Sequence, residues 1–255
     1  MKDWNPDNYL AFRNERTQPS IDLVEKIDLK NPKNIIDIGC GPGNSTQILL
    51  NKWPDSAIIG LDSSISMIEK AKKDYPHQTW IQGNAENITD ENKYSLVFSN
   101  AALQWMDNHE LLIPKLWNIV EDNGAFAAQI SNLKRMPIYE VINTVLNKTR
   151  WNHQVKKHEL NYNELGHYYE LLSKYTREII LWETNYFHIL PAIQRIVDFV
   201  HSTTLRPYLD QLNSEEEKKE FEADILEECK KRYKEQSNGK VLFPFHRIFI
   251  IAYKR

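Results

Sequence analysis

The chain has 255 residues, 41% of them hydrophobic and 26% charged, which is typical of a folded globular protein. Its formal net charge of −3 gives no electrostatic reason to expect nucleic acid or an anionic membrane as a partner. Two cysteines, Cys40 and Cys229, argue against a disulfide framework and favour a reducing compartment. With no signal-peptide-like start and no run long enough to cross a membrane, we expect a cytoplasmic monomer that binds neither nucleic acid nor membrane.

The first half of the chain predicts an α/β fold. Residues 1–30 have helical character, with Pro19 expected to open a second helix. From residue 33 to about 130, short apolar strands alternate with helices, a pattern typical of a parallel sheet covered on both faces. The strands are expected at 34–39, 57–62, 78–82, 95–100 and 124–130, and the helices at 45–52, 65–74 and 109–119.

Beyond Ile130 the pattern becomes largely helical and rich in aromatic residues. We interpret the whole of 1–255 as one domain, in which residues 1–30 cover a cofactor site and segments 131–177 and 191–240 form a helical cap over a substrate crevice. In chain order the sequence predicts helical structure at 137–175, a strand at 178–189, helices at 191–201 and 215–235, and a last strand at 245–253.

Two strand ends predict a nucleoside-cofactor site. The apolar pair Ile35-Ile36 leads into the glycine-rich turn Asp37-Ile38-Gly39-Cys40-Gly41-Pro42-Gly43, which lets a ligand approach the backbone closely. Asp62 ends the next apolar strand, 19 positions after Gly43. A carboxylate there can accept the protons of both ribose hydroxyls.

The glycine spacing distinguishes between two cofactors. The dinucleotide fingerprint G-x-G-x-x-G requires glycine where this chain has Asn44, so a nicotinamide oxidoreductase is disfavoured. The order D-x-G-x-G-x-G resembles motif I of class I S-adenosylmethionine-dependent methyltransferases, and segments 80–86 and 94–105 resemble that family's third and fourth strand ends. The resemblance implies a Rossmann-like fold, with a mostly parallel seven-stranded sheet, helices on both faces and S-adenosyl-L-methionine as cofactor. The cofactor-binding residues it implies are Asp37, Gly39, Gly41, Asp62, Ser63, Met67, Asn84, Ala85 and Asn100.

Two positions depart from the family pattern. Asn84 replaces an acid that accepts from the adenine amine; its amide oxygen can still accept, although an ordinary turn residue is the alternative. Ser95 replaces the customary acid at the end of the fourth strand that is remote from the cofactor.

A narrower resemblance covers nearly the whole chain. The segments Asp3-Trp4-Asn5-Pro6, Leu103-Gln104-Trp105, His167-Tyr168-Tyr169 and Leu205-Arg206-Pro207 look like those of bacterial trans-aconitate methyltransferases, as does Arg247 before Ile248-Phe249-Ile250. That family esterifies a carboxylate of a small tricarboxylate. A carboxylate is already ionised at neutral pH, so neither a general base nor a metal is expected.

A polyanionic substrate predicts arginines in the pocket, because a guanidinium meets a carboxylate bidentately. We expect two of Arg13, Arg16, Arg206 and Arg247 to bind it, with a structural ion pair as the alternative for each. The substrate-binding candidates together are Tyr9, Arg13, Gln104, Trp105, Tyr169, Arg206 and Arg247.

Two other functions stay open. A malonyl-carrier-protein O-methyltransferase would share the segments Ser99-Asn100 and Leu103-Gln104-Trp105, but it should carry a basic docking patch. A non-catalytic S-adenosylmethionine-binding protein would keep motif I and lose the acceptor pocket.

Overall fold

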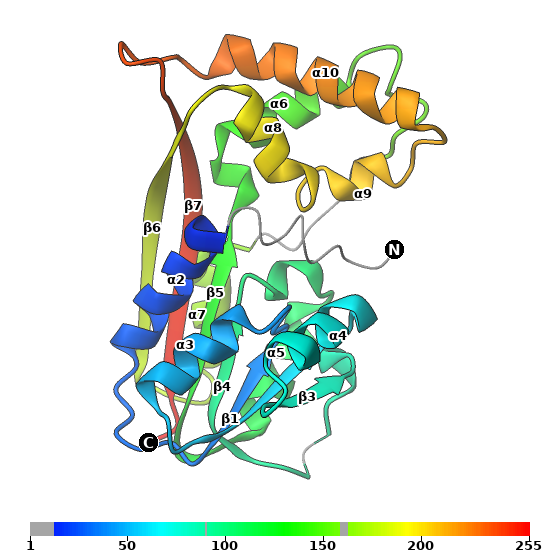
Figure 1. Cartoon of the computed structure of the whole chain (residues 1–255). Coiled ribbons are helices and arrows are strands. Elements are labelled where there is room, and N and C mark those ends of the chain that lie inside the picture. Colours follow the sequence, from blue (N-terminus) through cyan, green and yellow to red (C-terminus); the bar gives the residue numbers. More distant parts are fainter. Residues whose placement is uncertain (1–12, 90, 159–162) are drawn as a thin grey trace. The chain divides into compact units, whose positions relative to one another are not determined.

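In the computed structural model, strands form a seven-stranded sheet in the order β3-β2-β1-β4-β5-β7-β6 (Figure 1). The structure describes residues 13–89, 91–158 and 163–255, with the side chains of 13–16 outside this description. The strands are β1 (Asn34–Ile38), β2 (Ala57–Asp62), β3 (Thr79–Gln82), β4 (Tyr94–Asn100), β5 (Val120–Ser131), β6 (Ile179–Leu190) and β7 (Val241–Tyr253).

Helices account for most of the remaining described chain. The α-helices are α2 (Arg13–Lys26), α3 (Asn44–Lys52), α4 (Ile65–Asp74), α5 (His109–Asn118), α6 (Pro137–Leu146), α7 (Leu165–Leu172), α8 (Gln194–His201), α9 (Arg206–Leu209) and α10 (Glu215–Arg232). Short 3₁₀ turns follow β3, β4 and β5 as η1 (Ala85–Asn87), η2 (Leu103–Trp105) and η3 (Leu133–Arg135).

The sheet is mostly parallel. The pairs β1–β2, β1–β4, β2–β3 and β4–β5 run parallel, whereas β7 pairs antiparallel with β5. The carboxyl ends of β1, β2 and β4 therefore lie along one edge, and side chains from these three strand ends can converge on one ligand. This confirms the predicted α/β, mostly parallel seven-stranded fold.

The chain divides into two compact units. Among the described residues, 13–89, 91–131, 163–184 and 247–255 form the first, here called the sheet unit, which contains β1 to β5 and helices α2 to α5 and α7. Residues 132–158 and 185–246 form the second, here called the helical unit. Within the helical unit, α10 packs against α6 and α8, and the Trp151 ring lies edge-on to Phe221 at 5.2 Å.

Helices cover both faces of the sheet unit. On one face, Ile36, Val97 and Phe126 pack with residues of α5 and α7 in a continuous buried cluster. Neighbouring residues of a strand point to opposite faces. Asp37 accordingly contacts α3, on the face that also carries α2, and α2 packs beside α3 and β5.

One predicted boundary was wrong. Pro19 was expected to open a second helix, but α2 continues through it from Arg13 to Lys26. A proline inside a helix removes one backbone hydrogen bond and crowds the preceding turn, at a cost of about 3 kcal/mol. The following turns bury Leu23 and Val24 almost completely, and this apolar burial offsets the cost.

Other boundaries shifted without changing the architecture. The long helical stretch expected at 137–175 is two helices, α6 and α7, separated by a connection. β5 begins at Val120 rather than 124, and β7 begins at Val241 rather than 245. At the start of β5, Val120 pairs with Tyr94 of β4 before a register shift. At the start of β7, Val241 and Phe243 are buried, so both strands extend beyond the predicted segments.

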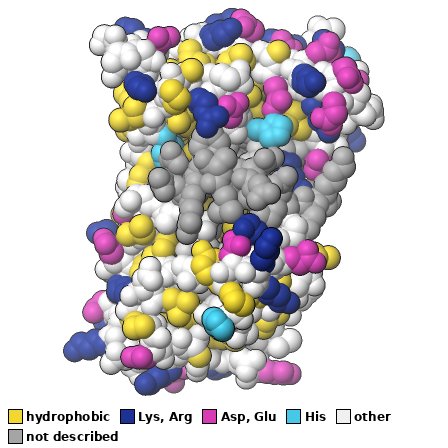
Figure 2. All heavy atoms as spheres, in the orientation of Figure 1, with side chains coloured by type: hydrophobic (Ala, Val, Ile, Leu, Met, Phe, Trp, Pro, Cys, Tyr) yellow, Lys and Arg dark blue, Asp and Glu magenta, His cyan; other side chains and the backbone are white. Residues whose placement is uncertain are grey.

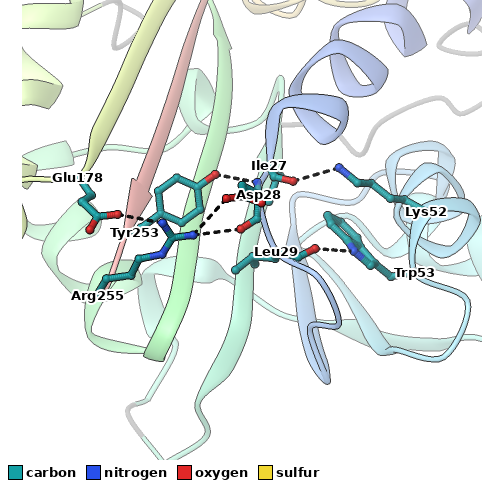
Figure 3. Close-up of polar contacts among 8 residues, drawn as sticks. All are labelled: Ile27, Asp28, Leu29, Lys52, Trp53, Glu178, Tyr253 and Arg255. Carbon is teal, nitrogen blue, oxygen red and sulfur yellow. Dashed lines mark hydrogen bonds and ion pairs between the residues drawn. The ribbon is translucent and has the colours of Figure 1, made fainter.

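The connection after α2 is held on two sides (Figure 3). The Asp28 N–H donates to the Tyr253 hydroxyl at 2.8 Å, at the end of β7. Lys52 donates to the carbonyl of Ile27 at 3.1 Å, and the indole of Trp53 donates to that of Leu29 at 3.1 Å. These bonds fix the C-terminal end of α2 to α3 and β7.

Candidate active site

The turn between β1 and α3 is built so that only glycine fits at its first position. Gly39 has φ of +68°, and a Cβ there would lie 2.2 Å from the Cβ of Ala102, in the connection after β4. The N–H groups of Gly39 and Cys40 both donate to the Leu61 carbonyl, at 2.7 and 3.1 Å. The turn is thus fixed against the ends of both neighbouring strands.

Asp62 holds the same turn from the end of β2. Its Oδ2 accepts the Gly41 N–H at 2.9 Å, and its Oδ1 accepts the Ser64 N–H at 2.9 Å. The two strand ends singled out in the sequence therefore meet. Each carboxylate oxygen has a second lone pair, so the group retains capacity to accept from ribose hydroxyls.

Asp37 lies fully buried beneath the turn. Its Oδ2 accepts the hydroxyls of Ser45 at 2.6 Å and Thr46 at 2.7 Å, both from the first turn of α3. Burial raises its pKa to about 6, the two hydroxyls oppose this rise, and the charge of Asp62 adds to it. Its Oδ1 has no hydrogen-bond partner among the described residues. A nearby cation would therefore stabilise the ionised form of the Asp37 carboxylate.

A hollow lies between this turn and α2. The side chains and backbone that line it come from α2, the β1–α3 turn, the start of α3 and the end of β4. Its lining residues are Thr17, Ser20, Gly39, Cys40, Pro42, Asn44, Ser45, Ile48 and Asn100. The Asn100 Oδ1 is buried and has no hydrogen-bond partner within the described chain, so this predicted cofactor residue presents an acceptor to the hollow.

Thr17 and Ser20 were not among the predicted site residues. The only signal for them was that residues 1–30 were expected to cover the cofactor site. Because Pro19 was expected to open a second helix, the sequence did not place Thr17 and Ser20 on one helix face, which α2 does.

The other predicted cofactor residues follow the ends of β2 and β3, which are paired up to Asp62↔Gln82. Ser63 is exposed, while Met67 is buried and its N–H donates to the Ser64 hydroxyl that caps α4. Ala85 is buried at the start of η1. The Asn84 side chain caps the same turn, with its Oδ1 accepting the Glu86 N–H at 2.9 Å.

Gln104 lies on η2, directly after β4, with 4% of its surface exposed. Its amide nitrogen donates to the Ala101 carbonyl at 2.8 Å, and its Oε1 has no hydrogen-bond partner in the described part of the chain. Ala101 has φ of +53°, a left-handed conformation that costs energy for alanine. Trp105, the next predicted residue, is half-buried on the same turn.

The other predicted substrate residues are spread over both units. In the sheet unit, Arg247 is 3% exposed and donates to the Gln129 amide oxygen at 3.0 Å, whereas Tyr169 on α7 is 49% exposed. In the helical unit, Arg206 begins α9, with its Nε 3.6 Å from Asp210 Oδ2. Tyr9 and the side chains of Arg13 and Arg16 lie outside the described residues.

The polar groups at these strand ends fit S-adenosyl-L-methionine. Asp37 Oδ1 and Asn100 Oδ1, which have no hydrogen-bond partner among the described residues, suit an ammonium. The Asp62 carboxylate suits ribose hydroxyls, and the glycines at 39 and 41 let a ligand reach the backbone. These groups come from three adjacent strand ends and their turns, as the parallel topology requires.

Comparison with known proteins identifies the class. Residues 35–124 match the family model described as a methyltransferase domain. The YcgJ protein of Bacillus subtilis shares the fold, with a TM-score of 0.60 at 14% identity over 93% of this chain and 99% of that one. Phosphoethanolamine N-methyltransferase 2 of Haemonchus contortus, solved with S-adenosyl-L-methionine, gives 0.57 at 12% identity over 93% and 53%. The fold and site define a class I methyltransferase that uses S-adenosyl-L-methionine.

Curated relatives narrow the class to a family. Trans-aconitate 2-methyltransferases of Shigella dysenteriae and Escherichia coli O139:H28 are each 35% identical to the chain over 260 residues, covering 99% of it and 98% of the relative. The chain belongs to this methyltransferase family. No helix among the described residues is long and apolar enough to cross a membrane.

Proposed function

We propose that this enzyme methylates a carboxylate oxygen of a small polycarboxylate, trans-aconitate above all, giving a monomethyl ester and S-adenosylhomocysteine. The observation that carries the proposal is the 35% identity to trans-aconitate 2-methyltransferases, which extends over 99% of the chain and so includes the segments outside motif I. A match limited to the cofactor half would support only the class.

The chemistry needs little from the protein beyond alignment. S-adenosyl-L-methionine, when bound, supplies a methyl group on a positively charged sulfur, and its transfer to an oxygen leaves a neutral thioether. The carboxylate is ionised at neutral pH and needs no general base, so we assign no catalytic acid or base and no metal. The protein has to hold the acceptor close to the methyl group and replace the water around its charges.

Arg247 is the strongest candidate for replacing the water around the charges of the acceptor. A buried guanidinium provides fixed positive charge where water is excluded, and one of its N–H groups donates to the neutral amide of Gln129. We propose the same role for Arg206, and contacts to the acceptor from Gln104, Trp105 and Tyr169. Tyr9 and Arg13 complete the proposed substrate set.

On the cofactor side, we propose that Asp62 binds the ribose and that Ser63 and Met67 lie beside it. Asn84 and Ala85 would contact the adenine. The caps that Asn84 makes within η1 leave the second lone pair of its Oδ1 for the adenine amine.

The remaining assignments concern the whole chain. We propose that it acts as a monomeric cytoplasmic enzyme, with 1–30 over the cofactor site and 131–177 and 191–240 capping the acceptor. Sedimentation equilibrium tests whether the enzyme is monomeric, and a dimer mass at micromolar concentration would contradict the proposal.

A methyl-transfer assay with labelled donor tests the function. The panel consists of trans-aconitate, cis-aconitate, isocitrate and malonyl carrier protein. We expect the highest kcat/KM with trans-aconitate and a base-labile methyl ester as product. An absence of transfer to all three small polycarboxylates would refute the proposal.

The carrier-protein alternative makes an opposite prediction. It requires a concentrated basic surface for an acidic carrier. On the face drawn in Figure 2, the described Lys and Arg side chains are interspersed with Asp and Glu. This mixed charge favours the small-molecule acceptor.

A further inference from the structure

We propose that α2 is part of the cofactor site, and that the hydroxyls of Thr17 and Ser20 bind the carboxylate at the amino-acid end of S-adenosyl-L-methionine. The inference concerns the methyl donor and does not depend on the identity of the acceptor.

The two hydroxyl oxygens are buried and have no hydrogen-bond partner in the part of the chain that the structure describes. Ser20 is 1% exposed, and neither its Oγ nor the Oγ1 of Thr17 has a hydrogen bond among the described residues. A serine or threonine inside a helix can bond to the carbonyl four residues earlier. Thr144 in α6 does so, at 2.8 Å from the Glu140 carbonyl. Thr17 and Ser20 instead line the hollow above the glycine turn.

The opposite wall of the hollow favours an anion. Asn44 and Ser45 belong to the first turn of the nine-residue helix α3. Its N-cap residue, Gly43, provides no side-chain cap, and the first turn contains no acid. The amino end of a helix carries partial positive charge and N–H groups that point outward. Two hydroxyl donors facing a helix N-terminus suit a carboxylate.

The same hollow also has groups for a cation. The Asn100 Oδ1 lines it, and Ser45, another lining residue, donates to the buried Asp37 carboxylate at 2.6 Å. An ammonium near these acceptors would offset the burial of Asp37. A ligand end that carries one carboxylate and one ammonium, as an α-amino acid does, matches both sets.

The hydroxyls are held in place before the ligand binds. α2 packs against α3, and the bonds from Asp28 to Tyr253 and from Lys52 to the Ile27 carbonyl fix its end (Figure 3). A rigid pair of donors loses little conformational freedom on binding. α2 therefore contributes to affinity and does more than cover the site.

Titration calorimetry with two ligands tests the proposal. S-adenosylhomocysteine has the amino-acid end, whereas 5′-methylthioadenosine has the same nucleoside and sulfur without it. The variants are Ser20→Ala, Thr17→Val and their combination. The matched control is Thr144→Val, a helix hydroxyl that is already bonded. Thermal unfolding establishes that each variant folds, and Ser20→Cys, which keeps the side-chain size, replaces Ser20→Ala if that variant does not.

We expect each variant to raise the Kd for S-adenosylhomocysteine by about tenfold, the usual effect of losing a hydrogen bond to a charged group. The Kd for 5′-methylthioadenosine should stay within about twofold, and Thr144→Val should change neither. Equal losses for both ligands would mean that the variants displace α2, and unchanged affinity for both would mean that the hydroxyls do not bind the ligand. Either result overturns the proposal. If binding follows the expected pattern but trans-aconitate is not methylated, only the proposed acceptor fails.

Discussion

The Tyr168 hydroxyl lies 2.7 Å from Nδ1 of His109, whose Nε2 lies 2.8 Å from the Leu103 carbonyl oxygen. A carbonyl can only accept, so Nε2 carries the proton. In the neutral ring Nδ1 then accepts from Tyr168, with the Asn163 amide 3.4 Å away. This buried imidazole joins α7 to η2, the turn that carries Gln104 and Trp105.

His109 should therefore make acceptor binding dependent on pH. Burial lowers its pKa below the ordinary 6.5, the nearby His167 lowers it further, and the Leu103 carbonyl and Glu110 oppose the shift. Below pH 6.5 the unfolded state binds the extra proton first, so the stability due to the neutral ring is lost as pH falls through the lowered pKa. We expect acceptor kcat/KM to fall on the acid side, and His109→Gln, which keeps a donor for Leu103, to remove part of that fall. The exposed His77→Gln is the control, and identical pH profiles for all three proteins would contradict the assignment.

Asp37 should have the opposite pH dependence. Its folded pKa of about 6 exceeds the ordinary 3.8, so the stability it provides is present at low pH and is lost as pH rises through 6. Asp37→Asn removes this titration, and the free energy of unfolding of the variant relative to wild type should rise by up to about 3 kcal/mol between pH 4 and 8. Denaturant unfolding at both pH values measures it. A difference that does not change between pH 4 and pH 8 would show that folding does not raise the pKa of Asp37.

Gly39→Ala should abolish cofactor binding. The added methyl would lie 2.2 Å from the Ala102 Cβ at a φ of +68°, so the turn has to move away from the end of β4. We expect a loss of about 1–3 kcal/mol in unfolding free energy together with undetectable binding of S-adenosylhomocysteine. Gly166→Ala is the control, because a Cβ at that position meets nothing within 4 Å. Normal cofactor binding by Gly39→Ala would contradict the close contact between the turn and Ala102.

Asp62→Asn should weaken donor binding while leaving the acceptor KM nearly unchanged at saturating donor. The amide oxygen can accept only one of the two backbone N–H groups that the carboxylate now binds, its NH2 cannot accept the other, and the charge is lost. An increase of about tenfold in donor Kd is expected for charge-assisted bonds. Equal increases in donor Kd and acceptor KM would argue against a ribose contact.

Arg247→Met should act on the acceptor alone. Removing a buried guanidinium removes the charge that stabilises the substrate carboxylates, and methionine retains much of the packing volume. Steady-state kinetics should show acceptor KM raised by about tenfold or more, with donor affinity intact. Arg195→Met, which removes an exposed arginine paired with Asp198, is the control. Wild-type kinetics for Arg247→Met would mean that other residues stabilise the substrate carboxylates.

The sequence predicted the parts of the site that depend on short stretches of chain. The turn at 37–43 and Asp62 were identifiable because a glycine pattern and a strand ending in an acid are local features, and the structure brings them together through Gly41 and Asp62. The parallel pairing of β1 to β5 followed from the βα alternation.

The contacts that the sequence did not reveal join distant residues. His109 and Tyr168 are 59 positions apart, and Arg247 and Gln129 are 118 apart, so no periodicity relates them. Thr17 and Ser20 matter only because α2 packs beside α3. Pro19 was misjudged because its local cost is outweighed by burial later in the helix.

The bond between Asp28 and Tyr253 has a consequence for synthesis of the protein. The residues that anchor α2 are separated by 225 positions, and the strand that carries Tyr253 is the last strand of the sheet. On a ribosome, β1 to β5 can assemble the glycine turn and Asp62 long before residue 253 emerges. The nascent enzyme would therefore acquire its nucleoside-binding groups and the bonds from Lys52 and Trp53 early, and the bond from Asp28 to Tyr253 last.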